Sequence, residues 1–355
     1  MIFVVAVGLY LSLSKKSESA QDYFLASKTL AWWAIGGSLI ASNISAEQFI
    51  GMSGSGYSVG LAIASYELMA AATLLLVAKY FLPVFLKEGI YTMPQFLEER
   101  FDKRVRTGLA FFWVFLIVFV NITSVLYLGG LALRPLMGVD ADGNFIMPLF
   151  YAILGLALYS ATFSIFGGLK AVVWTDVIQV VVLVFGGLLT TIIALDVVSE
   201  GQGFFAGLST LFEKAPEKFD MILDRSNPEY KNLPGISVLI GGMWIANIYY
   251  WGTNQYIIQR ALAAKSIQEA QKGVALASVL KVLLPIIVVV PGIAAYVLQA
   301  EINKPDEAYP WLLNTYVTAG FKGLTFAALI SAVGSSLSSM VNSASTIFTL
   351  DIYKP

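Results

Sequence analysis

The chain has 355 residues, of which 57% are hydrophobic and only 13% charged, with a formal net charge of −1 and a mean hydropathy of +0.75. A soluble protein of this length would carry about a quarter charged residues, so the composition excludes an ordinary soluble protein. The chain has no cysteine and no histidine, which excludes disulfides, thiolate or imidazole metal sites, and every Ser-His or Cys-His catalytic pair.

The apolar residues are grouped in runs that can cross a bilayer core, which takes about 20 helical residues. The sequence therefore predicts an all-α polytopic membrane protein with one transmembrane domain over residues 1–355. A β-barrel fits poorly, because it needs alternating segments of about 10 residues. The predicted spans are 1–13 (partial), 31–56, 59–86, 107–133, 147–166, 171–197, 235–259, 274–299 and 324–350. The first run is too short to span, and we expect the chain to be truncated at both ends.

Charged residues lie mainly in the connections between these runs. The positive-inside rule places the connection at 14–30 in the cytoplasm, together with Arg260, and places the loop 199–234 on the extracellular or periplasmic side. Within that loop, the stretch "GFFAGLSTLFEKAPEKF" predicts a short interfacial helix.

Of the charged residues inside the predicted spans, those expected at membrane depth are Glu47, Glu67, Asp176 and Lys281. A charge at the centre of a membrane helix costs about 2.5–3.5 kcal/mol, so each must face the bundle interior, a water-filled cavity or a partner. Glu67 and Lys281 could form a structural ion pair or face a ligand. Buried pairs stabilise poorly compared with apolar packing, which favours the ligand-facing role. We assign no role to Glu47.

Three spans are rich in polar residues and are predicted to be discontinuous. They contain "ASNISAEQFIGMSGSG" (41–56), "GGMWIANIYYWGTNQYIIQR" (241–260) and "ISAVGSSLSSMVNSAST" (330–346). In the third, helix–helix packing is the favoured role of Ser338, Ser339 and Ser343. Unwound helices near the midplane form the substrate and ion sites of secondary transporters. The first two broken spans start five helices apart, as a five-plus-five inverted repeat requires.

The stretches "DYFLASKTLAWWAIGGSLIASNISAEQFIGMSGSGYSVGLAIASYE", "FGGLKAVVWTDVIQ", "NIYYWGTNQYIIQR" and "AVGSSLSSMVNS" closely resemble the solute:sodium symporter family. The resemblance is greatest to its bacterial sodium/galactose (sodium/glucose-type) branch. It implies a LeuT-type inverted-repeat (5+5) fold with discontinuous helices, and further C-terminal helices that this chain lacks, one of which would close the site.

The activity implied by the resemblance is secondary active transport by alternating access, with sodium-coupled symport of a neutral monosaccharide of the galactose/glucose class. The protein would not be an enzyme, and sodium would be co-transported with no organic cofactor. The expected partners are a sugar, Na⁺ and the lipid bilayer of a bacterial inner membrane, with no nucleic acid. The oligomeric state stays open.

The same resemblance implies a sodium site made by the backbone carbonyls of Ala41, Ile44 and Ala332 and the hydroxyls of Ser335 and Ser336. The spacing of residues 332, 335 and 336 is compatible with this, since positions i, i+3 and i+4 share one helix face.

A sugar site is implied as well, and the family serine three residues after Glu67 is Ala70 here, which puts galactose itself in doubt but not the sugar class. The implied sugar-binding residues are Gln48, Glu67, Asn247 and Lys281 with Asn43 nearby, Tyr250 as a stacking inner gate, Met52 and Tyr66 as outer-gate residues, and Asp176 as a candidate ion-pathway residue.

The sequence leaves three alternatives to sodium/sugar symport. The first is a sodium-coupled carrier of another small solute, such as an amino acid, a carboxylate or an inositol-like polyol. The second is an intramembrane serine hydrolase at "GMSGSG", which without histidine would need Lys281 to reach Ser53 or Ser55. The third is a sodium channel, whose filter from symmetric repeats has no counterpart here.

Overall fold

The computed structural model describes residues 19–138 and 146–354, so the partial span predicted at 1–13 lies outside the described residues. Every regular element in these two ranges is helical, with one isolated bridge between Leu30 and Ala264. The predicted all-α architecture is therefore confirmed for the part of the chain that the structure describes.

The first half of the chain contains eight labelled helices within the described residues. Their bounds are α2 (Ala20–Leu25), α3 (Trp32–Asn43), α4 (Ala46–Ser58), α5 (Ser65–Leu76), α6 (Leu82–Glu88), α7 (Met93–Arg100), α8 (Lys103–Phe115) and α9 (Thr123–Leu133). Two π-helical segments, Val77–Phe81 and Leu116–Ile122, join α5 to α6 and α8 to α9. Short 3₁₀ turns cover Ala26–Lys28, Leu61–Ala64 and Arg134–Met137.

The second half contains the longest helices. Their bounds are α10 (Leu149–Val198), α11 (Phe204–Lys214), α12 (Gly235–Ile240), α13 (Gly242–Ile248), α14 (Gln255–Leu262), α15 (Ile267–Val297), α16 (Ala308–Tyr316) and α17 (Ala319–Ile347). π-helical segments cover Tyr249–Thr253 and Phe348–Tyr353, and 3₁₀ turns cover Pro216–Phe219, Pro228–Lys231 and Pro305–Glu307.

Five helical stretches among the described residues are long and apolar enough to cross a membrane, and a sixth is added if a bent pair counts as one span. The five are Leu61–Glu88, Lys103–Leu133, Gly168–Val198, Ile267–Val297 and Gly320–Tyr353. A shorter apolar helix, Leu149–Thr162, lies within the span predicted at 147–166. Gly168, at φ +54° and ψ −160°, interrupts α10 between the two predicted spans 147–166 and 171–197.

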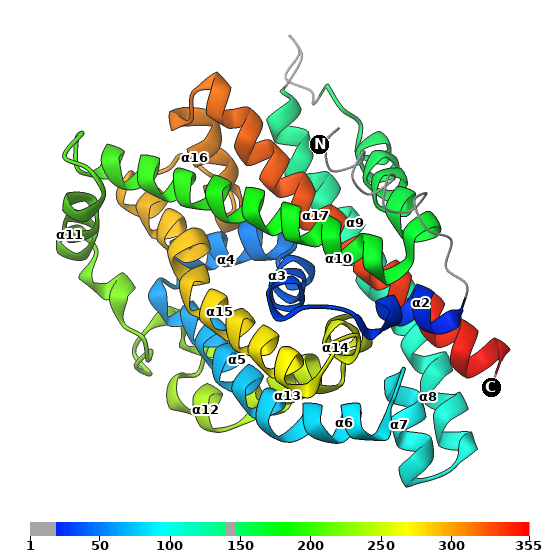
Figure 1. Ribbon diagram of the computed structural model, residues 1–355. Coiled ribbons are helices and arrows are strands. Elements are labelled where there is room, and N and C mark those ends of the chain that lie inside the picture. The colour runs from blue at the N-terminus through cyan, green and yellow to red at the C-terminus, as the bar shows by residue number, and fades with distance from the viewer. Residues whose placement is uncertain (1–18, 139–145, 355) are drawn as a thin grey trace.

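Helix α3 lies at the centre of the bundle in Figure 1, where α10, α14, α15 and α17 surround it. Residues 34–42 of this helix are all buried, as expected for a helix that is apolar all round. Helix α10 packs along α17, and α15 packs against both α3 and α4. The central position of α3 means that a break in it lies inside the protein.

The span predicted to be discontinuous at 41–56 is broken between α3 and α4, and the glycine-rich run that follows the break is helical. It forms most of α4, and only Ile44 and Ser45 separate α4 from α3. A Cβ on Gly56 would overlap the carbonyl of Val289 in α15, and a Cβ on Gly292 would overlap the carbonyl of Ser53. The glycines therefore permit close packing of α4 on α15.

The predicted discontinuity at 330–346 is wrong, because α17 continues through this stretch to Ile347. The hydroxyls of Ser338 and Ser339 donate to the carbonyl of Ser335, at 3.0 and 2.6 Å, within the same helix. Serine can thus satisfy its own polar group on a helix without unwinding it.

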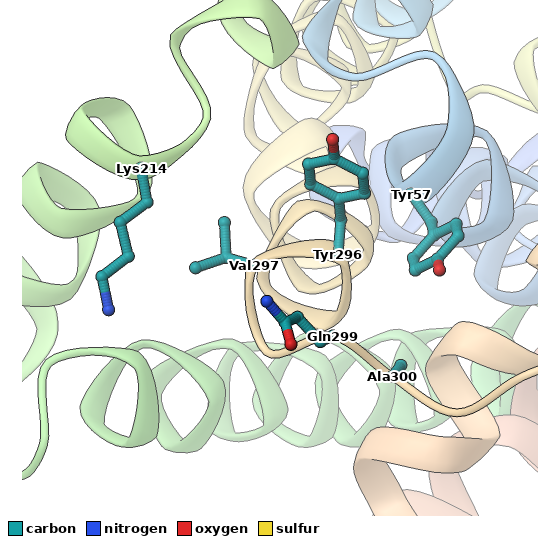
Figure 2. Close-up of a pocket in the computed structure, with 6 residues that line it drawn as sticks. All are labelled: Tyr57, Lys214, Tyr296, Val297, Gln299 and Ala300. Atoms are coloured by element: carbon teal, nitrogen blue, oxygen red, sulfur yellow. The ribbon is translucent and has the colours of Figure 1, made fainter.

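The loop 199–234 contains α11, where the interfacial helix was predicted, and then contacts the end of α4. Lys218 Nζ donates to the carbonyl of Ser58 (2.5 Å) and lies 4.2 Å from the centroid of the Tyr296 ring. Burial lowers the pKa of Lys218, against the raising effect of the carboxylates nearby. Figure 2 shows the adjoining hollow of about 590 Å³, with Lys214 on one side and Tyr57 and Tyr296 on the other.

Gly60, just after α4, packs against this loop, which leads to a stability prediction. Its φ is +94°, and an added Cβ would overlap the carbonyl of Lys218. We expect Gly60→Ala to lower the thermal unfolding temperature in detergent by more than Gly89→Ala does. Gly89 is a matched control, with φ +70° and no atom within 4 Å of its Cβ position. The Gly89→Ala variant therefore loses only the roughly 1–2 kcal/mol that a left-handed backbone conformation costs a residue with a Cβ. Equal shifts for the two variants would show that the contact with Lys218 contributes nothing.

Candidate functional site

The break between α3 and α4 supplies polar backbone groups inside the bundle. Helix α3 ends at Asn43, and Ile44 is extended, with φ −77° and ψ 107°. The carbonyls at the end of a helix have no partner in the next turn, and the N–H groups at the start of α4 are likewise free of helical partners. The break therefore provides carbonyl oxygens and amide hydrogens at one depth.

Helix α17 places its serines against this break. Ser336 Oγ donates to the carbonyls of Ser42 (3.0 Å) and Ile44 (3.4 Å). The predicted sodium residues Ala41, Ile44, Ala332, Ser335 and Ser336 are each exposed by 1% or less. The structure thus brings one predicted hydroxyl and one predicted carbonyl into contact, and it adds the carbonyl of Ser42, which the sequence did not indicate.

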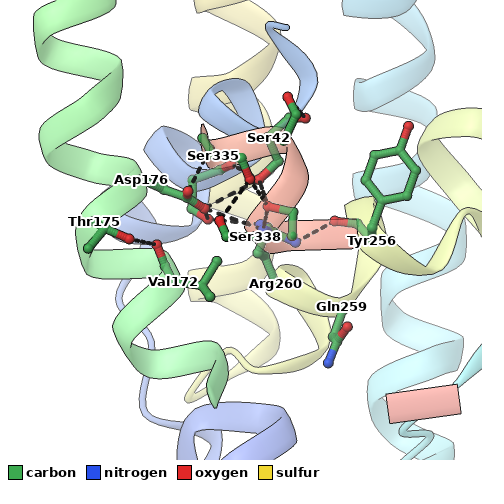
Figure 3. A network of polar contacts seen from close by, with 12 residues as sticks. Ser42, Val172, Thr175, Asp176, Tyr256, Gln259, Arg260, Ser335 and Ser338 are labelled. Carbon is green, nitrogen blue, oxygen red and sulfur yellow. Dashed lines mark hydrogen bonds and ion pairs between the residues drawn. The ribbon is translucent and has the colours of Figure 1, made fainter. Parts of the chain in front are cut away.

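Ser335 is turned towards Asp176 of α10 instead. Its hydroxyl donates to Asp176 Oδ1 (2.5 Å), while Asp176 Oδ2 accepts from Ser38 Oγ (2.5 Å) of α3. Figure 3 shows these contacts converging where α3, α10 and α17 meet. Asp176 is therefore within one hydrogen bond of the predicted sodium residues.

Arg260, which the charge pattern placed at the cytoplasmic end of its span, completes this network. It is fully buried, and its Nη2 lies 3.3 Å from Asp176 Oδ2. Helix α14 begins only at Gln255, after the extended residue Asn254, so Arg260 falls in its second turn and still lies inside the bundle. The charge pattern of the sequence indicated only that a basic residue ends this span.

The predicted sugar residues of α4, α5 and α15 also meet. Gln48 Nε2 donates to Glu67 Oε1 (2.5 Å), and Glu67 Oε2 forms an ion pair with Lys281 Nζ. Glu67 and Lys281 are 3% and 1% exposed. The two charges offset each other, so this part of the site carries hydrogen-bonding groups without a net charge.

Trp251 is a member of this cluster that the sequence analysis missed. Its side chain is 2% exposed, and the ammonium of Lys281 lies 5.3 Å from the ring centroid, within cation–π range. The ring meets that of Tyr250 edge to face, at 5.0 Å and 82°. The aromatic run "YYW" in the second broken span was the available signal, but it does not reveal which ring meets the lysine.

The second broken span holds Tyr250 next to the first. It bends by 74° at Gly241, passes through the π-helical segment Tyr249–Thr253 and breaks again at Asn254. The phenol oxygen of Tyr250 accepts from Asn43 Nδ2 (3.0 Å) and from the hydroxyl of Tyr256 (3.2 Å). The two broken spans are therefore joined through the residue predicted to be the inner gate.

A cavity of about 190 Å³ lies between these groups, far larger than the roughly 30 Å³ that one water occupies. It contains predicted sugar residues and a predicted sodium residue in a single space. Its lining residues are Ser42, Asn43, Ser45, Gln48, Val125, Tyr250, Tyr256, Ser336 and Met340.

A larger hollow of about 570 Å³ adjoins α4. It is lined by Ile50 and Gly51 of α4, by Arg134, and by acidic residues that include Glu301 and Asp306. Ile50 and Gln48 are two residues apart on α4 and so point to different sides of that helix, and the hollow shares no lining residue with the smaller cavity.

Other predicted site residues are placed less centrally. Asn247 is buried but donates to the carbonyl of Met243 (3.0 Å) within its own helix. Tyr66 is 41% exposed, and Met52 is half-buried against the core. The side chain of Glu47 lies outside the described part of the structure.

Comparison with known proteins gives a family match over residues 23–355, to the model described as Sodium:solute symporter family. The chain is 58% identical to a sodium/glucose cotransporter of Vibrio parahaemolyticus, over 99% of this chain and 66% of that protein. It is 34% identical to a sodium/myo-inositol cotransporter 2 of Mus musculus, over 99% of this chain and 55% of that protein. The chain thus spans less than two thirds of the length of these curated relatives.

A solved structure agrees with the fold. It is that of a sodium-coupled sialic acid symporter in a substrate-bound outward-open state, with a TM-score of 0.85 and 28% identity. The alignment covers 99% of this chain and 72% of that one. The predicted inverted-repeat transporter fold is therefore confirmed.

Proposed function

Because this chain belongs to the sodium:solute symporter family, a family of multi-pass membrane transporters rather than enzymes, we propose that it carries out sodium-coupled symport of a neutral monosaccharide of the glucose/galactose class. The mechanism is alternating access, in which the site opens to one side of the membrane at a time. The membrane is a bacterial inner membrane, with the connection at 14–30 in the cytoplasm.

The observation that carries this proposal is the shared cavity at the break of α3. Gln48, Asn43 and Tyr250 line it together with Ser336, whose hydroxyl contacts the carbonyls of the break. A hard cation such as sodium prefers oxygen ligands, and the neutral carbonyls and hydroxyls here suit weak, reversible binding. The sodium ligands that we propose are the carbonyls of Ala41, Ile44 and Ala332 with the hydroxyls of Ser335 and Ser336.

The sugar class is supported by the chemistry of the neighbouring cluster. Each sugar hydroxyl can both donate and accept, and Gln48, Glu67 and Lys281 offer donors and acceptors with no net charge. We propose that these residues, with Asn43 and Asn247, bind the sugar, and that the ring of Tyr250 covers its apolar face. Met52 and Tyr66 act as the outer gate in this proposal, and Asp176 lies on the sodium path.

A polyol such as an inositol is the second candidate substrate. The family serine is replaced by Ala70, which is 4% exposed and has no polar side chain to offer a hydroxyl. The mouse relative named as a sodium/myo-inositol cotransporter aligns over the same range. A ring of hydroxyls is common to both substrates, so the site chemistry fits either.

Uptake by proteoliposomes of the full-length protein tests the proposal. We expect radiolabelled glucose or galactose to accumulate only when an inward sodium gradient is imposed. Competition by unlabelled sugars, inositols and amino acids then distinguishes the substrate classes. Equal uptake under a potassium or proton gradient alone would refute sodium symport.

A further inference from the structure

A buried arginine lies beside the sodium residues without belonging to either ligand set. Arg260 Nε donates to Ser38 Oγ (2.8 Å), Nη2 donates to Ser339 Oγ, and Nη1 donates to the carbonyl of Tyr256. With the ion pair to Asp176, the guanidinium bridges α3, α10, α14 and α17 (Figure 3). A fully buried guanidinium with this many partners fixes the groups around it.

Asp176 is the charged group that Arg260 contacts. A buried carboxylate needs a cationic or hydrogen-bonded partner to stay ionised, and Arg260 supplies the positive charge. One carboxylate oxygen is occupied by Arg260 and Ser38, and the other accepts from Ser335 at 2.5 Å. Because the hydroxyl hydrogen of Ser335 points at Asp176, its oxygen lone pairs remain for a cation.

Arg260 is also connected to the inner gate. It lies four residues after Tyr256 on α14, and its guanidinium donates to the carbonyl of Tyr256. The hydroxyl of Tyr256 donates to that of Tyr250, which also accepts from Asn43 at the break of α3. One side chain thus links the orientation of Ser335 with the helix whose Tyr256 contacts the gate residue Tyr250.

We propose that Arg260 is a positioning residue for sodium binding, which acts through Asp176 on Ser335 and ties the sodium site to the gate residue Tyr250 through Tyr256 of α14. The proposal rests on the proposed function, because it takes Ser335 as a sodium ligand. Groups that orient a metal ligand from behind change metal affinity by about 10–100-fold when they are removed. A structural ion pair would instead affect only the amount of folded protein.

The test uses Arg260→Gln and Arg260→Lys in the full-length protein, with Arg104→Gln on the exposed start of α8 as a matched control. Two sodium titrations are compared: the sodium-dependent rise in unfolding temperature, with potassium as the reference salt, and sodium-driven sugar uptake. We expect Arg260→Gln to raise the half-saturating sodium concentration by about tenfold in both titrations. Arg260→Lys keeps the charge but loses the fork of donors, so its shift is smaller, and the control does not shift.

An unchanged half-saturating sodium concentration in either folded Arg260 variant overturns the proposal, whatever its effect on the unfolding temperature without sodium. If Arg260→Gln does not fold, the lysine variant decides, because it retains a cation beside Asp176. The failure of the proposed function gives a different result. Sodium would then stabilise the wild-type protein and the variants would shift that titration, but no gradient would drive sugar uptake.

Discussion

Lys281→Met is expected to reduce sodium-driven sugar uptake by about 10- to 100-fold and to destabilise the protein at the same time. The loss of uptake follows from removing a charged hydrogen-bond donor, worth about 1.5–3 kcal/mol, from the sugar site. The loss of stability has another cause. Glu67 is 3% exposed and would be left without its cation, and breaking a buried pair costs about 3–5 kcal/mol.

The double variant Glu67→Gln, Lys281→Met separates the two roles of the pair. It removes both charges while keeping side chains of similar size, so we expect the unfolding temperature to return close to that of the wild type. Gln48, which donates to Glu67 at 2.5 Å, can still bond to the new amide. Uptake should remain low in the double variant. If uptake recovers together with stability, the pair is structural only and the sugar assignment of both residues is wrong.

The breaks in the helices were predictable because their cause is local. Asn43 and Ser45 interrupt an apolar run, and Gly241 stands at the head of another, so composition alone marked two spans that the structure breaks. The same signal failed for α17. A serine-rich stretch looks equally polar whether its hydroxyls bond to their own helix or to a ligand, and tertiary structure decides which.

The missed residues of the site have a different cause. The sequence indicated only that Arg260 ends a span on the cytoplasmic side, and its ion pair is made with Asp176, which lies on another helix. Trp251 meets Lys281 through the packing of two helices, and no periodicity within either helix records that contact. Contacts between distant segments therefore limited the prediction. The resemblance to the family, in contrast, located Gln48, Glu67 and Lys281, which contact one another in the structure.

Ser336→Ala is expected to raise the sodium concentration for half-maximal uptake by about tenfold or more. The variant loses a proposed ligand oxygen, and the loss of one favourable polar interaction of about 1–3 kcal/mol corresponds to roughly 5- to 100-fold in affinity. It also leaves the carbonyls of Ser42 and Ile44 without the donor at 3.0 and 3.4 Å that now holds α17 against the break. Ser345→Ala is the matched control, because Ser345 is exposed on the same helix.

The measurement must separate sodium from sugar, because Ser336 also lines the cavity that holds Asn43 and Gln48. Uptake is therefore titrated with sodium at saturating sugar and with sugar at saturating sodium. If Ser336 serves the ion, the first titration shifts and the second stays within about twofold, since excess sodium compensates for the weaker site. A shift confined to the sugar titration would move Ser336 to the sugar site. The broken segment carries groups for both ligands. If the variant needs more sodium, and its affinity for sugar is reduced at low sodium but not at saturating sodium, the two sites are coupled.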